Sequence, residues 1–289
     1  MILTVVFALA AGLCYATAAV VQQKVAAQQA PELSLSPRLI IALVKRPMWL
    51  GGIAVDVTAY LFEAAALGAG SVIVVGPLMV SGLLFAIPLA TVGTKQHITR
   101  REMIPALMVT AGLALFVAVG SPEGGGSSAA FTSWAIVGVA VALASGTCIA
   151  FGRWWSRSGS QRALLFGLGT GILYSLTAVL TKSTVDLIHP GFDGIIGVLG
   201  HWQPYALVIV SVAGLVVNQS AFQAGHVAAS LPVISVANPV LSSTMGVALF
   251  SEHLGAHGVL PLTVTALAIA TMVVGTMRLA RSPLVSHAH

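Results

Sequence analysis

The sequence has little charge. Only 7% of its 289 residues are Asp, Glu, Lys or Arg, whereas 57% are hydrophobic. A soluble domain carries about a quarter charged residues, so this composition excludes a soluble protein and predicts a polytopic membrane protein without a separate soluble domain. The formal net charge of +5 comes from basic residues in short segments between apolar runs, and this distribution excludes nucleic acid as a partner.

Cysteine pairs and catalytic motifs are missing as well. Cys14 and Cys148 both fall inside apolar runs, without CxxC or Cys/His spacing, which argues against disulfides and structural zinc. The chain contains no HExxH, GxSxG or paired-Asp motif, so we expect no enzymatic activity. No cofactor is predicted.

Nine apolar segments are each long enough to cross the hydrocarbon core of a bilayer, which needs about 20 residues. The predicted spans are 2–21, 49–67, 71–92, 103–119, 131–151, 163–182, 205–223, 228–250 and 260–279. With this alternation, all Lys and Arg residues except Lys182 fall on one side. The positive-inside rule therefore predicts a multi-pass protein of the cell (inner or plasma) membrane, with the N-terminus outside and the C-terminus in the cytoplasm.

An internal repeat relates the two halves of the chain. The matched pairs include Gly12 with Gly171, Tyr15 with Tyr174, Ala66 with Ala221, Gly70 with Gly225, and Pro77 with Pro232. A single helix between two four-helix units inverts the second copy. The predicted fold is therefore all-α, with inverted four-helix repeats at 1–120 and 163–289 joined by a connector helix and cytoplasmic loop at 121–162. Because the first span belongs to the repeat, we expect it to be retained rather than cleaved.

Acidic residues lie inside the predicted spans only at Asp56 and Glu63. Together with Tyr60 they have the spacing i, i+4, i+7, which places them on one face of a helix. Carboxyls inside a membrane are unfavourable and usually functional, although each could instead be protonated and hydrogen-bonded in a helix interface. Seven helical residues rise about 10.5 Å, so both carboxyls cannot ligate one bare ion.

The repeat extends this polar face to the second half. Asp56 matches Ser211 and Glu63 matches Asn218, so we expect the two faces to meet across one central cavity. The predicted substrate- and ion-binding residues are Asp56, Tyr60, Glu63, Ser211, Asn218, Gln219, Ser235 and Asn238. Asp56 and Glu63 are also the candidate metal ligands, with the metal unknown. A hydrated magnesium ion bridging the two and a proton-exchanging carboxyl both stay open.

Three prolines are predicted to kink helices or to take part in gating. Pro77 and Pro232 occupy matching places near the starts of the third and eighth spans, and Pro239 follows Asn238 within the eighth. Proline inside a helix frees a backbone carbonyl one turn earlier. A purely structural role is the alternative, because proline is common near helix starts.

Three stretches resemble the drug/metabolite transporter (DMT) superfamily. They are a tyrosine-bearing first span that ends in QQK, the segment WLGGIAVDVTAYLFEAAALGAGSVIVVGPLMVSGLLFA, and the segment SEHLGAHGVLPLTVTALAIATMVVG. The N-terminal half most resembles the NIPA-like magnesium transporters, near the EamA-like branch. The anchors are Ala59-Tyr60, Pro77-Leu78 and Glu252. The resemblance implies alternating access, with the substrate between the two halves.

The chain departs from the NIPA pattern at the residues that matter most. Gly52-Ile53 stands where that pattern has Gly-Glu, Asp56 stands where it has Asn, and Glu63 stands where it has a small residue. The acidic positions have therefore moved, so the resemblance does not carry magnesium specificity to this chain. The nine predicted spans are also one fewer than in ten-helix members.

We therefore expect a secondary active transporter for a small polar or cationic solute, coupled to a proton or cation through Asp56 and Glu63. The alternatives are a NIPA-type magnesium or divalent-cation transporter, a flippase for a lipid-linked sugar, and a non-transporting membrane assembly subunit. A flippase should show a polar lateral opening, and an assembly subunit should lack a cavity that reaches Asp56. The expected partners are a small-molecule or ion substrate and the lipid bilayer, with a homodimer left open.

Overall fold

The computed structural model describes residues 2–69, 82–91, 99–120, 122–123, 130–187, 197–250, 253–254 and 259–280. The long helices are α1 (Ile2–Ala26), α3 (Pro47–Ala69), α6 (Arg100–Gly120), α7 (Phe131–Trp154), α8 (Gly159–Asp186), α10 (Gln203–Ala224), α11 (Val227–Phe250) and α12 (Val259–Ala280). The shorter elements are η1 (Pro31–Leu33), α2 (Pro37–Val44), α5 (Gly82–Thr91), β1 (Pro122–Glu123) and β2 (His253–Leu254). The two short strands pair antiparallel.

Six of the described helices are long and apolar enough to cross a membrane: α1, α7, α8, α10, α11 and α12. The protein is therefore an all-α, multi-pass membrane protein. The other three predicted spans fall on α3, α5 and α6, and of the third span only 82–91 belongs to the described residues. The nine-span topology and its orientation stay predictions. Pro77 lies outside the described residues.

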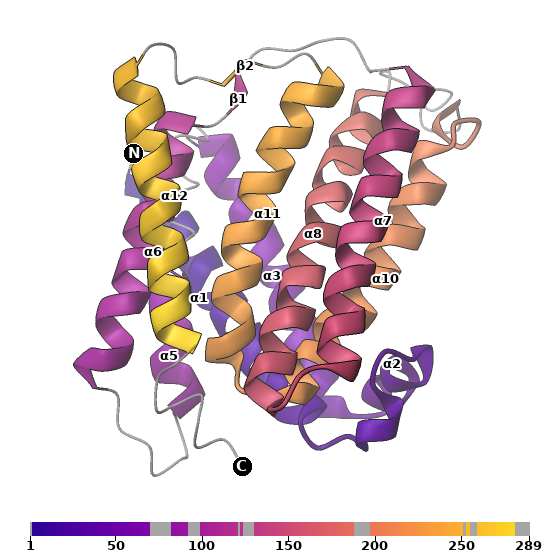
Figure 1. Cartoon of the computed structure of the whole chain (residues 1–289), viewed down its shortest axis with the longest axis vertical. Coiled ribbons are helices and arrows are strands. Elements are labelled where there is room, and N and C mark those ends of the chain that lie inside the picture. Colours follow the sequence, from indigo (N-terminus) through magenta and orange to yellow (C-terminus); the bar gives the residue numbers. More distant parts are fainter. Residues whose placement is uncertain are drawn as a thin grey trace.

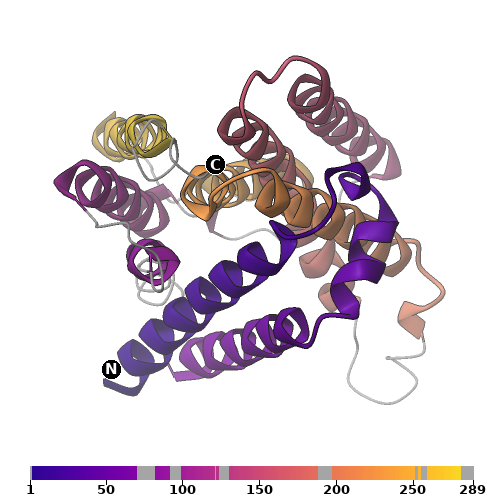
Figure 2. The same cartoon turned by 90° about the horizontal axis from the view of Figure 1, so that it is seen from below.

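The helices form one bundle that lies mostly along the long axis (Figure 1). Helices α6 and α12 lie side by side at one edge, α7, α8 and α10 gather at the other, and α11 lies between them. Seen from below, α1 and α3 run side by side across one face (Figure 2). The amphipathic helix α2 lies at the lower end, where α1 ends and α3 begins.

Helices that correspond in the predicted repeat pack in corresponding pairs. Helix α1 packs mainly against α3 and α5, and its predicted counterpart α8 packs mainly against α10 and α11. One close contact recurs at matching positions: a Cβ on Gly82 would lie 2.6 Å from the Gly12 carbonyl oxygen, and a Cβ on Gly171 would lie 2.6 Å from the Ala237 Cβ. Small residues thus let α5 and α11 approach their neighbours closely.

Helix α2 is anchored to the bundle by its apolar side. Ser36 caps its first turn, accepting a hydrogen bond from the Arg38 N–H at 3.2 Å. Leu39 and Leu43 are fully buried in a cluster that also holds Trp49 and residues of α1, α10 and α11. This cluster joins the two halves of the chain at the lower end and fixes the start of α3.

Replacing Gly82 with Ala should destabilise the protein. The added methyl group meets the backbone of Gly12, which cannot rotate away, so α5 must shift from α1 at a cost of about 1–3 kcal/mol. The melting temperature in detergent should fall by several degrees. The matched change Gly138→Ala on α7 meets no atom within 4 Å and should leave the melting temperature unchanged or slightly raised. Equal melting temperatures for the two variants would contradict the close α1–α5 contact.

Candidate functional site

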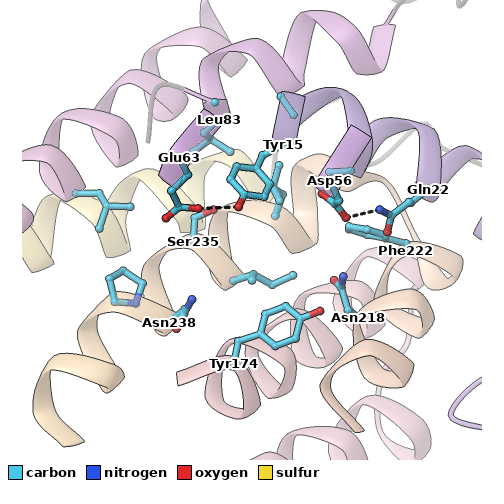
Figure 3. A pocket seen from close by; sticks show the side chains of 17 residues that line it. Tyr15, Gln22, Asp56, Glu63, Leu83, Tyr174, Asn218, Phe222, Ser235 and Asn238 are labelled. Carbon is cyan, nitrogen blue, oxygen red and sulfur yellow. Dashed lines mark hydrogen bonds between the residues drawn. The ribbon is translucent and has the colours of Figure 1, made fainter. Parts of the chain in front are cut away.

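A cavity of about 550 Å³ lies between the helices of the two halves. From the first half it is lined mainly by α1 and α3, and from the second by α8, α10 and α11 (Figure 3). Apolar side chains form most of its wall, and a few polar groups converge on it. A mostly apolar cavity with a few placed polar groups is typical of a small-molecule binding site.

The first-half wall carries two hydrogen-bonded pairs between α1 and α3. The Tyr15 hydroxyl donates to Glu63 Oε2 at 2.7 Å, and Gln22 Nε2 donates to Asp56 Oδ2 at 2.6 Å. Both partners are spaced seven residues apart on their own helices, as two antiparallel helices in contact require. Each carboxyl is thus held by a neutral donor on α1, which leaves its remaining acceptor capacity to the cavity.

The second-half wall carries neutral polar groups. The Tyr174 phenol interacts with the Asn218 side chain, and both residues line the cavity. The amide oxygens of Asn218 and Asn238 are buried and have no hydrogen-bond partner among the described residues. In the predicted repeat, Tyr174 and Asn218 correspond to Tyr15 and Glu63, so each wall carries one tyrosine–polar pair (Figure 3).

Helix α11 adds a further acceptor. Pro232 and Pro239 both lie inside this helix. Pro239 has no N–H to donate to the carbonyl of Ser235, one turn earlier, and Ser235 and Pro239 both line the cavity. Helix α11 is continuous through both prolines. Pro239 lies beside the site, whereas Pro232 is not among its described lining residues, and the predicted kink stays a prediction.

One end of the cavity is bounded by a chain of buried hydrogen bonds that joins the two halves. Trp49 Nε1 donates to Gln219 Oε1 at 3.1 Å, and Gln219 Nε2 donates to Gln22 Oε1 at 2.7 Å. Gln22 then donates to Asp56. We call these four residues the glutamine relay. Gln219 is 0% exposed and Gln22 is 2% exposed, so both glutamine side chains of the relay are shielded from solvent.

Further contacts brace the relay. The Leu35 N–H donates to the Ser220 hydroxyl at 2.9 Å, Gln223 Nε2 donates to the Ala30 carbonyl at 2.7 Å, and Gln23 Nε2 donates to the Gly225 carbonyl at 3.4 Å. The segment after α1 is therefore tied to the end of α10. This end of the protein is the predicted cytoplasmic side.

The turn between α10 and α11 lies at the same end. His226 Nδ1 accepts the Ala228 N–H at 3.2 Å and so caps the start of α11. Burial lowers the pKa of His226, which favours the neutral imidazole that this acceptor role requires. Because the His226 imidazole is then uncharged near neutral pH, the α10–α11 turn needs no acidic partner to balance it.

The structure brings together most of the residues predicted for the site. Those that line the cavity are Asp56, Glu63, Asn218, Ser235, Asn238 and Pro239. Gln219 lies behind Asn218, in the relay. Among the described residues, no group of three or more His, Cys, Asp or Glu side chains could hold a metal ion.

Tyr60 and Ser211 are not among the described residues that line the cavity. Tyr60 is 63% exposed on the outer surface of α3, because the buried face of this helix is centred near Ala59 and one residue further turns the side chain by about 100°. Ser211 shares a face with Asn218 but does not line the cavity. The Tyr174 ring packs against Gly214, which lies between Ser211 and Asn218 on α10.

Sequence reasoning missed Tyr15, Tyr174 and Gln22 as site residues. A signal for the tyrosines existed, because they match in the repeat and lie within otherwise apolar spans. Gln22 lies in the QQK end of the first span, for which the sequence favours a polar helix end at the membrane surface over a gate residue. Its role depends on Gln219, which is far away in the sequence, and nothing local indicates this contact.

A comparison with known proteins gives one informative relative. The chain is 30% identical over 255 residues to an uncharacterized protein of Corynebacterium glutamicum, and the match covers 87% of this chain and 86% of the relative. The chain belongs to the same family as this protein. The match is long enough to include parts of both halves of the bundle. No protein-family model matches the sequence, and no solved structure matches it.

Replacing Gln219 with Leu should destabilise the protein by about 1–3 kcal/mol. The indole N–H of Trp49 and the side-chain oxygen Oε1 of Gln22 would lose their hydrogen-bond partners while still buried. Removing both glutamines, in the double variant Gln22→Leu/Gln219→Leu, should cost less than the sum of the single changes. Thermal unfolding of the four proteins in detergent measures this coupling. Additive losses would show that the two side chains do not interact.

Proposed function

We propose that the protein is a secondary active transporter of the drug/metabolite transporter type, which moves a small cationic solute through this cavity by alternating access. The observation that carries the proposal is a cavity between the two halves that reaches both Asp56 and Glu63. An assembly subunit has no need of such a cavity. In this proposal the predicted inverted repeats are the two parts that move.

The charge of the wall supports a cationic solute. Two carboxyls line the cavity, and its described lining residues include no Lys, Arg or His. The groups that bond the carboxyls, Gln22 and Tyr15, are neutral. An ionised carboxyl in low-dielectric surroundings is destabilised unless a positive charge or a proton compensates it. An entering cation supplies that charge, whereas an anion would add to the repulsion.

The glutamine relay supports coupling between Asp56 and the closed end. Ionised Asp56 is a strong acceptor for Gln22, and the same glutamine bonds Gln219 across the two halves. A cation or proton on Asp56 competes for its electron density and weakens that acceptor. In our proposal this loosens the relay and opens the predicted cytoplasmic side, so loading of the site and opening of the gate are one event.

NIPA-type magnesium transport is the second candidate. The exposed acceptors of the cavity are all oxygens, which Mg²⁺ prefers, and a hydrated Mg²⁺ ion needs only one or two carboxylates. We place it second because the two carboxyls are about 10.5 Å apart along α3, too far to ligate one ion together. The same assay tests both candidates.

Asp56→Asn should reduce transport at least tenfold while the melting temperature stays near that of the wild type. The amide keeps the shape of the side chain but removes the charge that receives the cation. Transport is measured as substrate-induced current in proteoliposomes on a solid-supported membrane, with 1-aminobutane, tetraethylammonium, 1,4-diaminobutane and MgCl₂ as probes.

The control is Thr58→Val on the exposed face of α3, where the hydroxyl bonds only its own helix. This variant should transport like the wild type. Wild-type currents from Asp56→Asn with every probe, or currents from none of the probes in any protein, would refute the proposal. A current with MgCl₂ alone would favour the second candidate.

A further inference from the structure

The polar groups of the cavity gather at two separate poles. In Figure 3, Asp56 and Asn218 lie toward one end of the cavity, and Glu63 and Asn238 lie toward the other. Each pole thus combines a carboxyl from α3 with an amide from the opposite wall. Both amide oxygens are buried without a hydrogen-bond partner among the described residues. Two poles of the same chemistry fit a ligand with two similar ends.

We propose that the ligand is a linear dication with a primary amino group at each end and an apolar chain between them, the chemistry of an α,ω-diaminoalkane. This inference rests on the proposed function and names its substrate class. An ammonium group has three donors and no acceptor, which matches the acceptors of one pole, a carboxylate and an unpaired amide oxygen. Two such groups satisfy both poles.

The apolar part of the cavity wall suits a methylene chain. It includes Ala16, Ala19, Leu231 and Ile234. These side chains offer no hydrogen bonds, so a ligand that is polar along its whole length would lose its hydration there without compensation. A chain of methylene groups loses nothing and buries apolar surface.

The spacing of the poles sets the length of the chain. The two carboxyls are separated by about 10.5 Å along α3. Allowing a charge-assisted hydrogen bond of about 2.8 Å at each end leaves about 5 Å between the nitrogens when the bonds lie along the axis, and more when they lie across it. Diamines with three to five methylene groups cover this range, the four- and five-methylene chains when the hydrogen bonds lie across the axis, whereas 1,2-diaminoethane is too short.

Charge compensation distinguishes a diamine from a monoamine and from a single Mg²⁺ ion. A monoamine neutralises one carboxyl and leaves the other without a cation. A single Mg²⁺ ion carries enough charge but cannot contact both poles. A diamine places one positive charge at each carboxyl, so both are compensated in the same bound state.

Binding is tested by isothermal titration calorimetry of the purified full-length protein in detergent with 1,4-diaminobutane, 1,5-diaminopentane, 1,2-diaminoethane, 1-aminobutane and MgCl₂. We expect the four- and five-carbon diamines to bind at least tenfold more tightly than 1-aminobutane, and 1,2-diaminoethane to bind no more tightly than 1-aminobutane. Equal affinity for 1,4-diaminobutane and 1-aminobutane, or tighter binding of MgCl₂ than of any diamine, would overturn the inference.

Variants show whether both poles are used. In Glu63→Gln and in Asp56→Asn, the ratio of the affinities for 1,4-diaminobutane and 1-aminobutane should fall to about one, while Thr58→Val should keep the wild-type ratio. A diamine preference that survives either charge removal contradicts two-pole binding. If a charge variant does not fold, the length series on the wild type decides alone. Transport of 1-aminobutane that depends on Asp56, without any diamine preference, would refute this inference and leave the proposed function standing.

Discussion

The structure depends on how two carboxyls are accommodated in an apolar helical bundle. A carboxyl within a membrane needs a hydrogen-bond partner or a cation, and α1 supplies the partner in both cases, through Gln22 and Tyr15. These two bonds set the register of α1 on α3. Because Gln22 also accepts from Gln219, the first carboxyl is linked directly to the second half of the chain. Support of the site and closure of one end are therefore the same set of contacts.

The two walls of the cavity are related but not equivalent. Tyr15 and Glu63 correspond to Tyr174 and Asn218 in the predicted repeat, so an acid on one wall faces an amide on the other. Negative charge is thus confined to α3, and the opposite wall offers neutral acceptors. In the proposed function, a cation between the walls would contact both halves, and movement of one half against the other would change those contacts. Only an interaction that differs between two states can shift their populations.

Much of this could be predicted from the sequence, because the signals are local. Apolar runs of sufficient length gave the helices, and the seven-residue spacing of Asp56 and Glu63 gave their common face. The position of Tyr60 could not be predicted in this way, since the edge of a buried face depends on which neighbour covers the helix. The glutamine relay is less accessible still. Gln22 and Gln219 meet only because α1 and α10 pack in three dimensions.

In the proposed transporter, the relay closes the cavity at the end where α1 ends, and the site is reached from the opposite side. Accessibility to a membrane-impermeant thiol reagent in oriented vesicles tests this most directly, with Cys14 and Cys148 replaced by Ala. The exposed turn at Lys45, changed to Cys, marks the relay side. Ser235→Cys, inside the cavity, should react only from the side opposite to Lys45→Cys. Labelling of both variants from the same side, or no labelling of Ser235→Cys from either side, would contradict the account.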